Sequence, residues 1–157
     1  MIERFRAWHY KAGMLGRTGL QRLPKHILFY RDGVSESQYG MVRFEEMPQI
    51  KQACQQTLAH LKEVKNSGIK QSDTWNPHLT LVVVTKRHHA RFYKTNDADT
   101  NPDCGMVVDQ TVVTPRDFTF YLQSHNSPLG TARNAHYVVL HDDAGWDPIA
   151  LQVLVCS

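Results

Sequence analysis

The stretch His26-Ile27-Leu28-Phe29-Tyr30-Arg31-Asp32-Gly33 decides the fold of this chain. After His26, the side chains from Ile27 to Tyr30 are apolar or aromatic at successive positions. This pattern predicts an interior strand covered by helices on both sides. Asp32-Gly33 is a strong turn signal and ends the strand abruptly. Ser35 and Gln38 then form an S-x-x-Q capping-box pattern, so we expect a helix to begin just after the turn.

A long amphipathic helix and a second strand follow this turn. The helix is predicted by one apolar stripe, with Pro48 at a first-turn position. The stripe consists of Ile50, Ala53, Cys54, Leu58, Leu61 and Val64. His78–Thr85 is rich in β-branched residues and predicts a second buried strand. A strand, a helix and a strand in succession form a βαβ crossover, which is right-handed and joins parallel strands.

The remaining segments complete an α/β domain with a mixed sheet. Further strands are predicted at Met106–Val113, Phe118–Gln123 and His136–Leu140, and further helices at Ile2–Ala12 and Pro148–Val155. The polar stretch Thr95–Gly105 is interpreted as a surface loop. The chain opens on a helix with no preceding strand and stops inside its last helix. We therefore expect residues 1–157 to form one domain that is incomplete at both ends.

Composition narrows the class of protein without revealing its partner. A chain of 157 residues with 41% hydrophobic residues is neither collagen-like nor wholly disordered, and a net charge of +3 is too small to indicate a ligand. The three cysteines include no C-x-x-C unit, which argues against a disulfide scaffold or a zinc ribbon and favours a reducing, intracellular setting. Neither a signal peptide nor a run of about 20 apolar residues is present, so a soluble protein is expected.

Asp32 ends the first strand, where open α/β sheets place their ligand crevice. An Asp followed by Gly is more often a turn residue or a helix cap than a catalyst. The alternative is a carboxylate held for a divalent cation, which requires partner ligands. Glu36 is either such a partner or an exposed acid favoured by the helix dipole.

The run Lys86-Arg87-His88-His89-Ala90-Arg91 directly follows the second strand, so its side chains are expected at the same sheet edge as Asp32. Five cationic or titratable side chains there favour a phosphate-binding site. A solvated loop is the alternative. The histidine pair also suggests zinc, but no third ligand occurs at a recognised spacing, and we rank metal below phosphate.

A second loop, Ser124–Arg133, follows the strand Phe118–Gln123. It supplies hydroxyls, a glycine and an arginine, which suits contact with a sugar-phosphate chain. A plain polar loop is the alternative, and the likeness to the Lys86–Arg91 run favours a second phosphate contact. The acidic pair Asp142-Asp143 is interpreted as solvated surface.

Taken together, these motifs resemble the PIWI domain of eukaryotic Argonaute proteins. They are Ile27–Glu36, Val82–Phe92, Val107–Asp109, Phe118–Leu122 followed by Ser124-His125, and Gly130–Arg133 followed by His136-Tyr137. They occur in family order over almost the whole chain, which is far more specific than one short motif. The resemblance implies an RNase H-like fold, present here as a partial PIWI domain, and a surface that binds guide RNA.

The resemblance also implies roles for individual residues. Asp32 matches the third member of a four-residue catalytic site that holds Mg²⁺ and hydrolyses target RNA in active members of the family. The other three members fall outside this chain, so we expect neither tight Mg²⁺ binding nor cleavage by the chain alone. The residues that match the guide-strand channel are Lys86, Arg87, His89, Arg91, His125, Thr131 and Arg133. Ser127 and Asn134 depart from the usual Gly and Pro, and His141 replaces a commonly aromatic residue.

The sequence therefore predicts Argonaute-type binding of a small guide RNA and a target RNA in RNA silencing. Silencing-complex proteins are expected as further partners, no membrane is expected, and the location is cytoplasmic or nuclear. Slicer-type endonuclease activity is expected only of a complete parent protein. The alternatives are a stand-alone, non-catalytic RNA-binding module and an inactive truncated product. The predicted function requires Lys86, Arg91 and Arg133 to converge on one groove.

Overall fold

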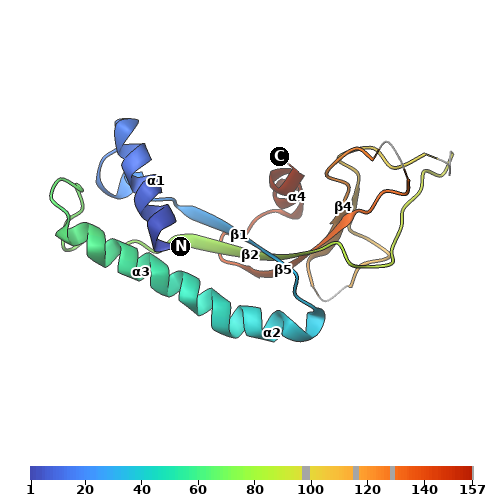
Figure 1. Cartoon of the computed structure of the whole chain (residues 1–157), viewed down its shortest axis with the longest axis horizontal. Helices are drawn as coiled ribbons and strands as arrows, with labels where there is room; N and C mark the ends of the chain where they lie inside the picture. Colours follow the sequence, from blue (N-terminus) through green and yellow to red (C-terminus); the bar gives the residue numbers. More distant parts are fainter. Residues whose placement is uncertain (97–99, 115–116, 128–129, 157) are drawn as a thin grey trace. The chain divides into compact units, whose positions relative to one another are not determined.

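The computed structural model describes residues 1–96, 100–114, 117–127 and 130–156 (Figure 1). Its elements are α1 (Ile2–Met14), η1 (Gly19–Arg22), β1 (His26–Asp32), η2 (Glu36–Gln38), α2 (Tyr39–Met41), η3 (Val42–Glu46), α3 (Met47–Glu63), β2 (His78–Thr85), β3 (Val107–Val108), β4 (Thr119–Leu122), β5 (Ala135–Asp142) and α4 (Pro148–Cys156). The chain divides into a helical unit, residues 1–27 and 37–79, and a sheet unit, residues 28–36 and 80–157. Among the described residues, no helix is long and apolar enough to cross a membrane.

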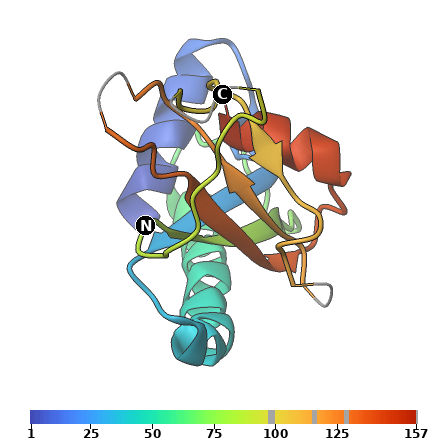
Figure 2. The same ribbon diagram turned by 90° about the vertical axis from the view of Figure 1, so that its right-hand side faces the viewer.

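A five-stranded mixed sheet runs in the order β1-β2-β5-β4-β3 (Figure 2). Strand β5 pairs antiparallel with both β2 and β4, and β3 pairs antiparallel with β4. Strands β1 and β2 begin side by side, because the rings of His26 and His78 stack at 5.2 Å and the His78 amide donates to the Lys25 carbonyl at 2.9 Å. Neighbouring strands that begin together run parallel, which agrees with the predicted βαβ crossover.

The core of the sheet unit lies on β2, β4 and β5. Its buried members are Val82, Phe120, Leu122, Ala135 and Tyr137. The rings of Phe120 and Tyr137 stack at 5.1 Å with only 7° between their planes. Helix α4 lies against this unit through Val155, and its Gln152 amide donates to the Asp109 carboxylate at 2.9 Å (Figure 2). Helix α4 is therefore attached to the sheet unit by one apolar contact and by one hydrogen bond.

The helical unit is organised by α3, against which α1 lies (Figure 1). Helix α3 buries Ile50, Cys54, Thr57 and Leu61 on one helical face, which confirms most of the predicted apolar stripe. Val64, its last predicted member, lies beyond the end of the helix and is exposed. Trp75 meets the ring of Phe5 edge-on at 5.3 Å, and its indole N–H donates to the Pro24 carbonyl at 2.9 Å.

Two local predictions are wrong. Strand β1 lies at the edge of the sheet with Tyr30 and Asp32 exposed, because successive apolar residues do not report how many strands lie beside them. The strand predicted at Met106–Val113 shortens to Val107–Val108, and Thr111 adopts a φ of 66°, which no strand accommodates. A helix does begin just after the turn at Gly33, as predicted, and its first turn, Glu36–Gln38, is a 3₁₀ helix.

The interpretation of Asp142 as a solvated acid is also wrong. Its Oδ1 accepts hydrogen bonds from the Thr80 hydroxyl at 2.7 Å and the Ala144 amide at 3.1 Å, and its Oδ2 accepts one from the Trp146 amide at 2.8 Å. One carboxylate thus joins the end of β5 to β2 and shapes the turn that leads to α4.

Replacing this carboxylate is expected to destabilise the chain. Asp142→Ala leaves the Thr80 hydroxyl and two backbone amides without their acceptor and should lower the free energy of unfolding by about 1–3 kcal/mol. Urea denaturation followed by tryptophan fluorescence measures the change. Asp117→Ala, which removes an exposed carboxylate of the same unit, is the control. Equal stability of the two variants would contradict the structural role of Asp142.

Candidate nucleic-acid interface

The register of β5 brings the predicted RNA-contacting segments to one edge of the sheet. At that edge, Thr85 of β2 pairs with His136, and Leu122 of β4 pairs with Ala135. The chain therefore leaves β2 and β4 exactly where it enters β5. Residues 86–92, 123–127 and 130–134 all extend from this edge, which we call the loop edge. Because β1 runs parallel to β2, its last residue, Asp32, also lies at the loop edge.

Most of the predicted contact residues on the loop edge face solvent. The exposed ones are Lys86, Arg87, His89, His125, Thr131 and Arg133. Arg91 is half-buried, and its Nη1 donates to the carbonyl oxygens of His88 at 3.1 Å and Ala90 at 2.7 Å. Part of the Arg91 guanidinium thus stabilises its own loop, while the other cations remain accessible to an anionic ligand.

Asn101 organises the second loop, and the sequence analysis did not single it out. Its Nδ2 donates to the carbonyl oxygens of Ser127 at 2.8 Å and Gly130 at 2.7 Å, and its Oδ1 accepts from the Ala132 amide at 2.8 Å. One side chain therefore holds the backbone on both sides of Thr131, at Gly130 and at Ala132. Nothing in the pattern around Asn101 indicates this role, because its partners lie 26 to 31 residues away.

Gln123 fixes the exit from β4. Its side chain is fully buried, and its Nε2 donates to the His125 carbonyl, while its backbone amide donates to the Met106 carbonyl at 3.0 Å. The bond from Gln123 therefore fixes the backbone at His125, while the His125 imidazole is exposed to solvent.

His136 lies inside the loop edge, stacked on Tyr121 with 4.4 Å between ring centroids. Burial lowers the pKa of His136, and the neighbouring His88 lowers it further, whereas the Glu36 carboxylate opposes the shift. The pKa of His136 therefore depends on charges from both the first basic loop and the turn after β1.

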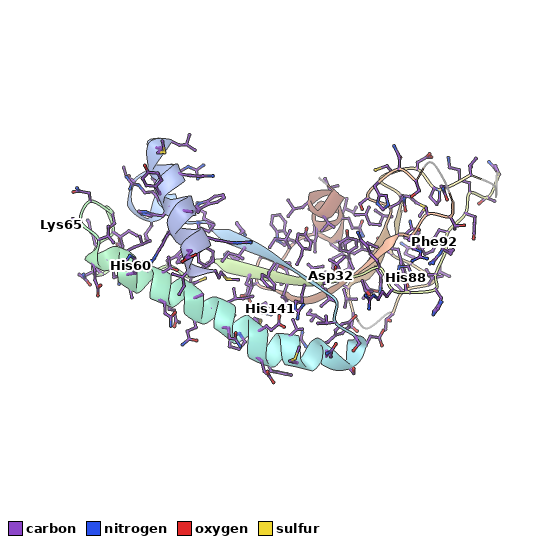
Figure 3. All side chains as sticks on the ribbon, viewed as in Figure 1. Asp32, His60, Lys65, His88, Phe92 and His141 are labelled. Carbon is purple, nitrogen blue, oxygen red and sulfur yellow. The ribbon has the colours of Figure 1, made fainter. Side chains whose placement is uncertain are left out.

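The donor set around Asp32 does not fit a catalytic metal centre. The carboxylate of Asp32, labelled in Figure 3, is exposed. Gly33 takes the positive φ of 77° that the tight turn requires. No group of three or more His, Cys, Asp or Glu side chains capable of holding a metal occurs in the described part of the chain. A pair of catalytic Mg²⁺ ions needs several oxygen ligands, and a single exposed carboxylate does not supply them.

A family model described as the Piwi domain matches residues 15–157. The chain belongs to the Piwi domain family. It is 39% identical over 136 residues to protein argonaute 9 of Arabidopsis thaliana, covering 87% of this chain and 14% of that protein. With protein argonaute 4B of Oryza sativa it is 39% identical over 137 residues, covering 87% of this chain and 13% of the relative. This Piwi-domain chain thus spans about one seventh of the length of these curated relatives.

Solved structures confirm the RNase H-like (PIWI) fold that the resemblance predicted. The C-terminal lobe of a budding yeast Argonaute superposes with a TM-score of 0.78 at 25% identity, covering 97% of this chain and 29% of that one. Drosophila Piwi superposes with a TM-score of 0.67 at 27% identity, covering 95% of this chain and 18% of that one.

Removing the Asn101 side chain is expected to loosen the second loop. Asn101→Ala loses three hydrogen bonds, so the Ala132 amide should exchange with solvent deuterium at least about fivefold faster, which corresponds to about 1 kcal/mol. Asn101→Asp retains the acceptor for Ala132 and loses the two donated bonds, so it should protect that amide better than Asn101→Ala. Hydrogen exchange followed by NMR tests both variants. Unchanged exchange in Asn101→Ala would show that this clamp does not hold the loop.

Proposed function

We propose that this chain supplies part of the guide- and target-RNA binding surface in Argonaute-type RNA silencing. The observation that carries the proposal is the antiparallel pairing of β5 with β2 and β4, which gathers two polar loops at one edge. Lys86, Arg87 and Arg133 are exposed on those loops. Phosphate groups are bound by clustered lysine and arginine side chains together with hydroxyl and backbone donors, and the loop edge offers all of these.

The comparisons support RNA as the ligand. A solved structure of the Kluyveromyces polysporus Argonaute with a guide RNA has the same fold as this chain, with a TM-score of 0.75 at 24% identity. The curated relatives are argonaute proteins of plants. We also propose a cytoplasmic or nuclear location, which suits the free thiols of Cys54 and Cys104.

Binding and cleavage are separate properties of this surface. The loops bind through cations and hydrogen-bond donors that the chain itself contains, whereas hydrolysis of a phosphodiester requires an assembled metal centre. Members of the family depend on metal for slicing, and the donor set at Asp32 does not assemble such a centre. We therefore derive RNA binding, and no cleavage step, from the residues present.

The charge on the loops predicts salt-dependent binding of single-stranded RNA. Lys86→Ala, Arg87→Ala and Arg133→Ala should each weaken binding about fivefold, equivalent to about 1 kcal/mol, and flatten the slope of log K against log salt by about 0.7. Fluorescence anisotropy with a labelled RNA over a salt series measures both quantities.

Lys65→Ala is the matched control, because it removes one exposed cation from the turn that follows α3 rather than from the loop edge (Figure 3). It should change the salt slope by far less than the three loop variants. If Lys65→Ala weakened binding as much as they do, RNA would be held by net charge alone and the proposed surface would be wrong.

The donor set at Asp32 predicts that the chain does not cut RNA. With a guide, a complementary target and millimolar Mg²⁺, no product should form, and Asp32→Asn should bind RNA at least as tightly as the wild type because one negative charge is lost. Gel electrophoresis of end-labelled target provides the readout. Cleavage that disappears in Asp32→Asn would refute this prediction.

A further inference from the structure

His88 is the inward-facing member of the first basic loop. Its neighbours Arg87 and His89 are exposed, whereas the His88 ring is partly buried and directed toward the strands (Figure 3). Its Nε2 lies 2.7 Å from the backbone oxygen of Asn134, immediately before β5. Because a carbonyl oxygen only accepts hydrogen bonds, Nε2 must carry the hydrogen, and this contact selects the Nε2–H tautomer.

This hydrogen bond joins the two loops proposed to contact RNA. His88 belongs to the segment that leaves β2, and Asn134 directly follows Arg133 in the segment that enters β5. The two residues are separated by 46 positions in the sequence. A single imidazole therefore sets the spacing between the cations of one loop and Arg133 on the other.

Aromatic contacts hold the same loop at two points. The ring of His88 meets Tyr121 of β4 edge-on at 5.1 Å, and the ring of Phe92 meets the same tyrosine at 5.1 Å. Tyr121 is itself stacked on His136 of β5. The loop is thus anchored through His88 and Phe92 on a ring stack that spans two strands, while Lys86 and Arg87, directly before the first anchor, remain exposed.

We propose that His88 is a positioning residue, which holds the first basic loop against the start of β5 so that Lys86, Arg87 and Arg133 act on one RNA backbone. This inference rests on the proposed RNA-binding function and deepens it. The physical benefit is preorganisation, because a loop already ordered before binding loses less conformational entropy when it meets its ligand. His88 itself does not need to touch RNA.

Three substitutions separate the hydrogen bond from the ring contacts. His88→Phe retains an aromatic ring and loses the donor. His88→Gln loses the ring but places an amide N–H near the position of Nε2. His88→Ala loses both. His60→Gln, a matched replacement on α3 outside the loop edge, serves as the control (Figure 3).

RNA binding by the full chain is measured by anisotropy over a salt series. His88→Phe and His88→Ala should weaken binding about three- to tenfold and flatten the salt slope by at least about 0.7, because the two loops no longer contact the same backbone. His88→Gln should recover most of both losses, and His60→Gln should match the wild type. A purely structural defect would instead lower the fraction of active protein in a stoichiometric titration and leave the slope unchanged.

The tautomer provides a test that needs neither RNA nor a variant. Nitrogen-15 NMR of the wild-type chain should show His88 as the Nε2–H form, and an Nδ1–H form would overturn the inference. If the wild type binds RNA and His88→Phe binds with the same affinity and slope, the inference is overturned while the proposed function stands. If the wild type binds no RNA, the proposed function and this inference both fall.

Discussion

The antiparallel pairing of β5 between β2 and β4 is the constraint on which the rest of the sheet unit depends. It sets the residues at which the chain leaves two strands and enters a third, and so determines which loops become neighbours. Side chains alternate between the two faces of a strand, so a shift by one residue would turn Tyr137 out of the core and His136 into it. The same register that buries the apolar face thus places the basic loops together.

Backbone pairing ends at the loop edge, and individual polar side chains take over its role beyond that point. Asn101, Gln123 and His88 each bond to carbonyl or amide groups of a loop that has few strand partners of its own. Asp142 does the same at the opposite end of β5. Backbone groups outside regular structure still need partners when they are shielded from water. The fold meets this requirement with buried or half-buried side chains and leaves the cations in solvent.

This arrangement explains how a chain with so small a net charge can present the proposed phosphate-binding surface. Its charge of +3 is spread over 18 basic and 15 acidic residues, and the loop edge concentrates several of the basic ones. The electrostatic potential at the loop edge depends on how these basic side chains are arranged there, rather than on the net charge of the chain. Asp32 also lies at the loop edge, and its carboxylate carries the opposite charge to the lysine and arginine side chains of the loops. The loop edge therefore suits the proposed binding of RNA, whereas Asp32 alone does not form a metal centre.

Local patterns in the sequence were sufficient to predict α3, β2 and the turn at Asp32-Gly33. Periodicity and turn chemistry operate over a few residues, and these features need nothing more. The edge position of β1, the inward orientation of His88 and the partners of Asn101 and Asp142 emerged only in the tertiary structure. The bonds that Asn101 makes, and the bond of Thr80 to Asp142, join residues 26 to 62 positions apart. A single sequence carries no periodic signal for such pairs, because strand order and register alone decide which distant residues meet.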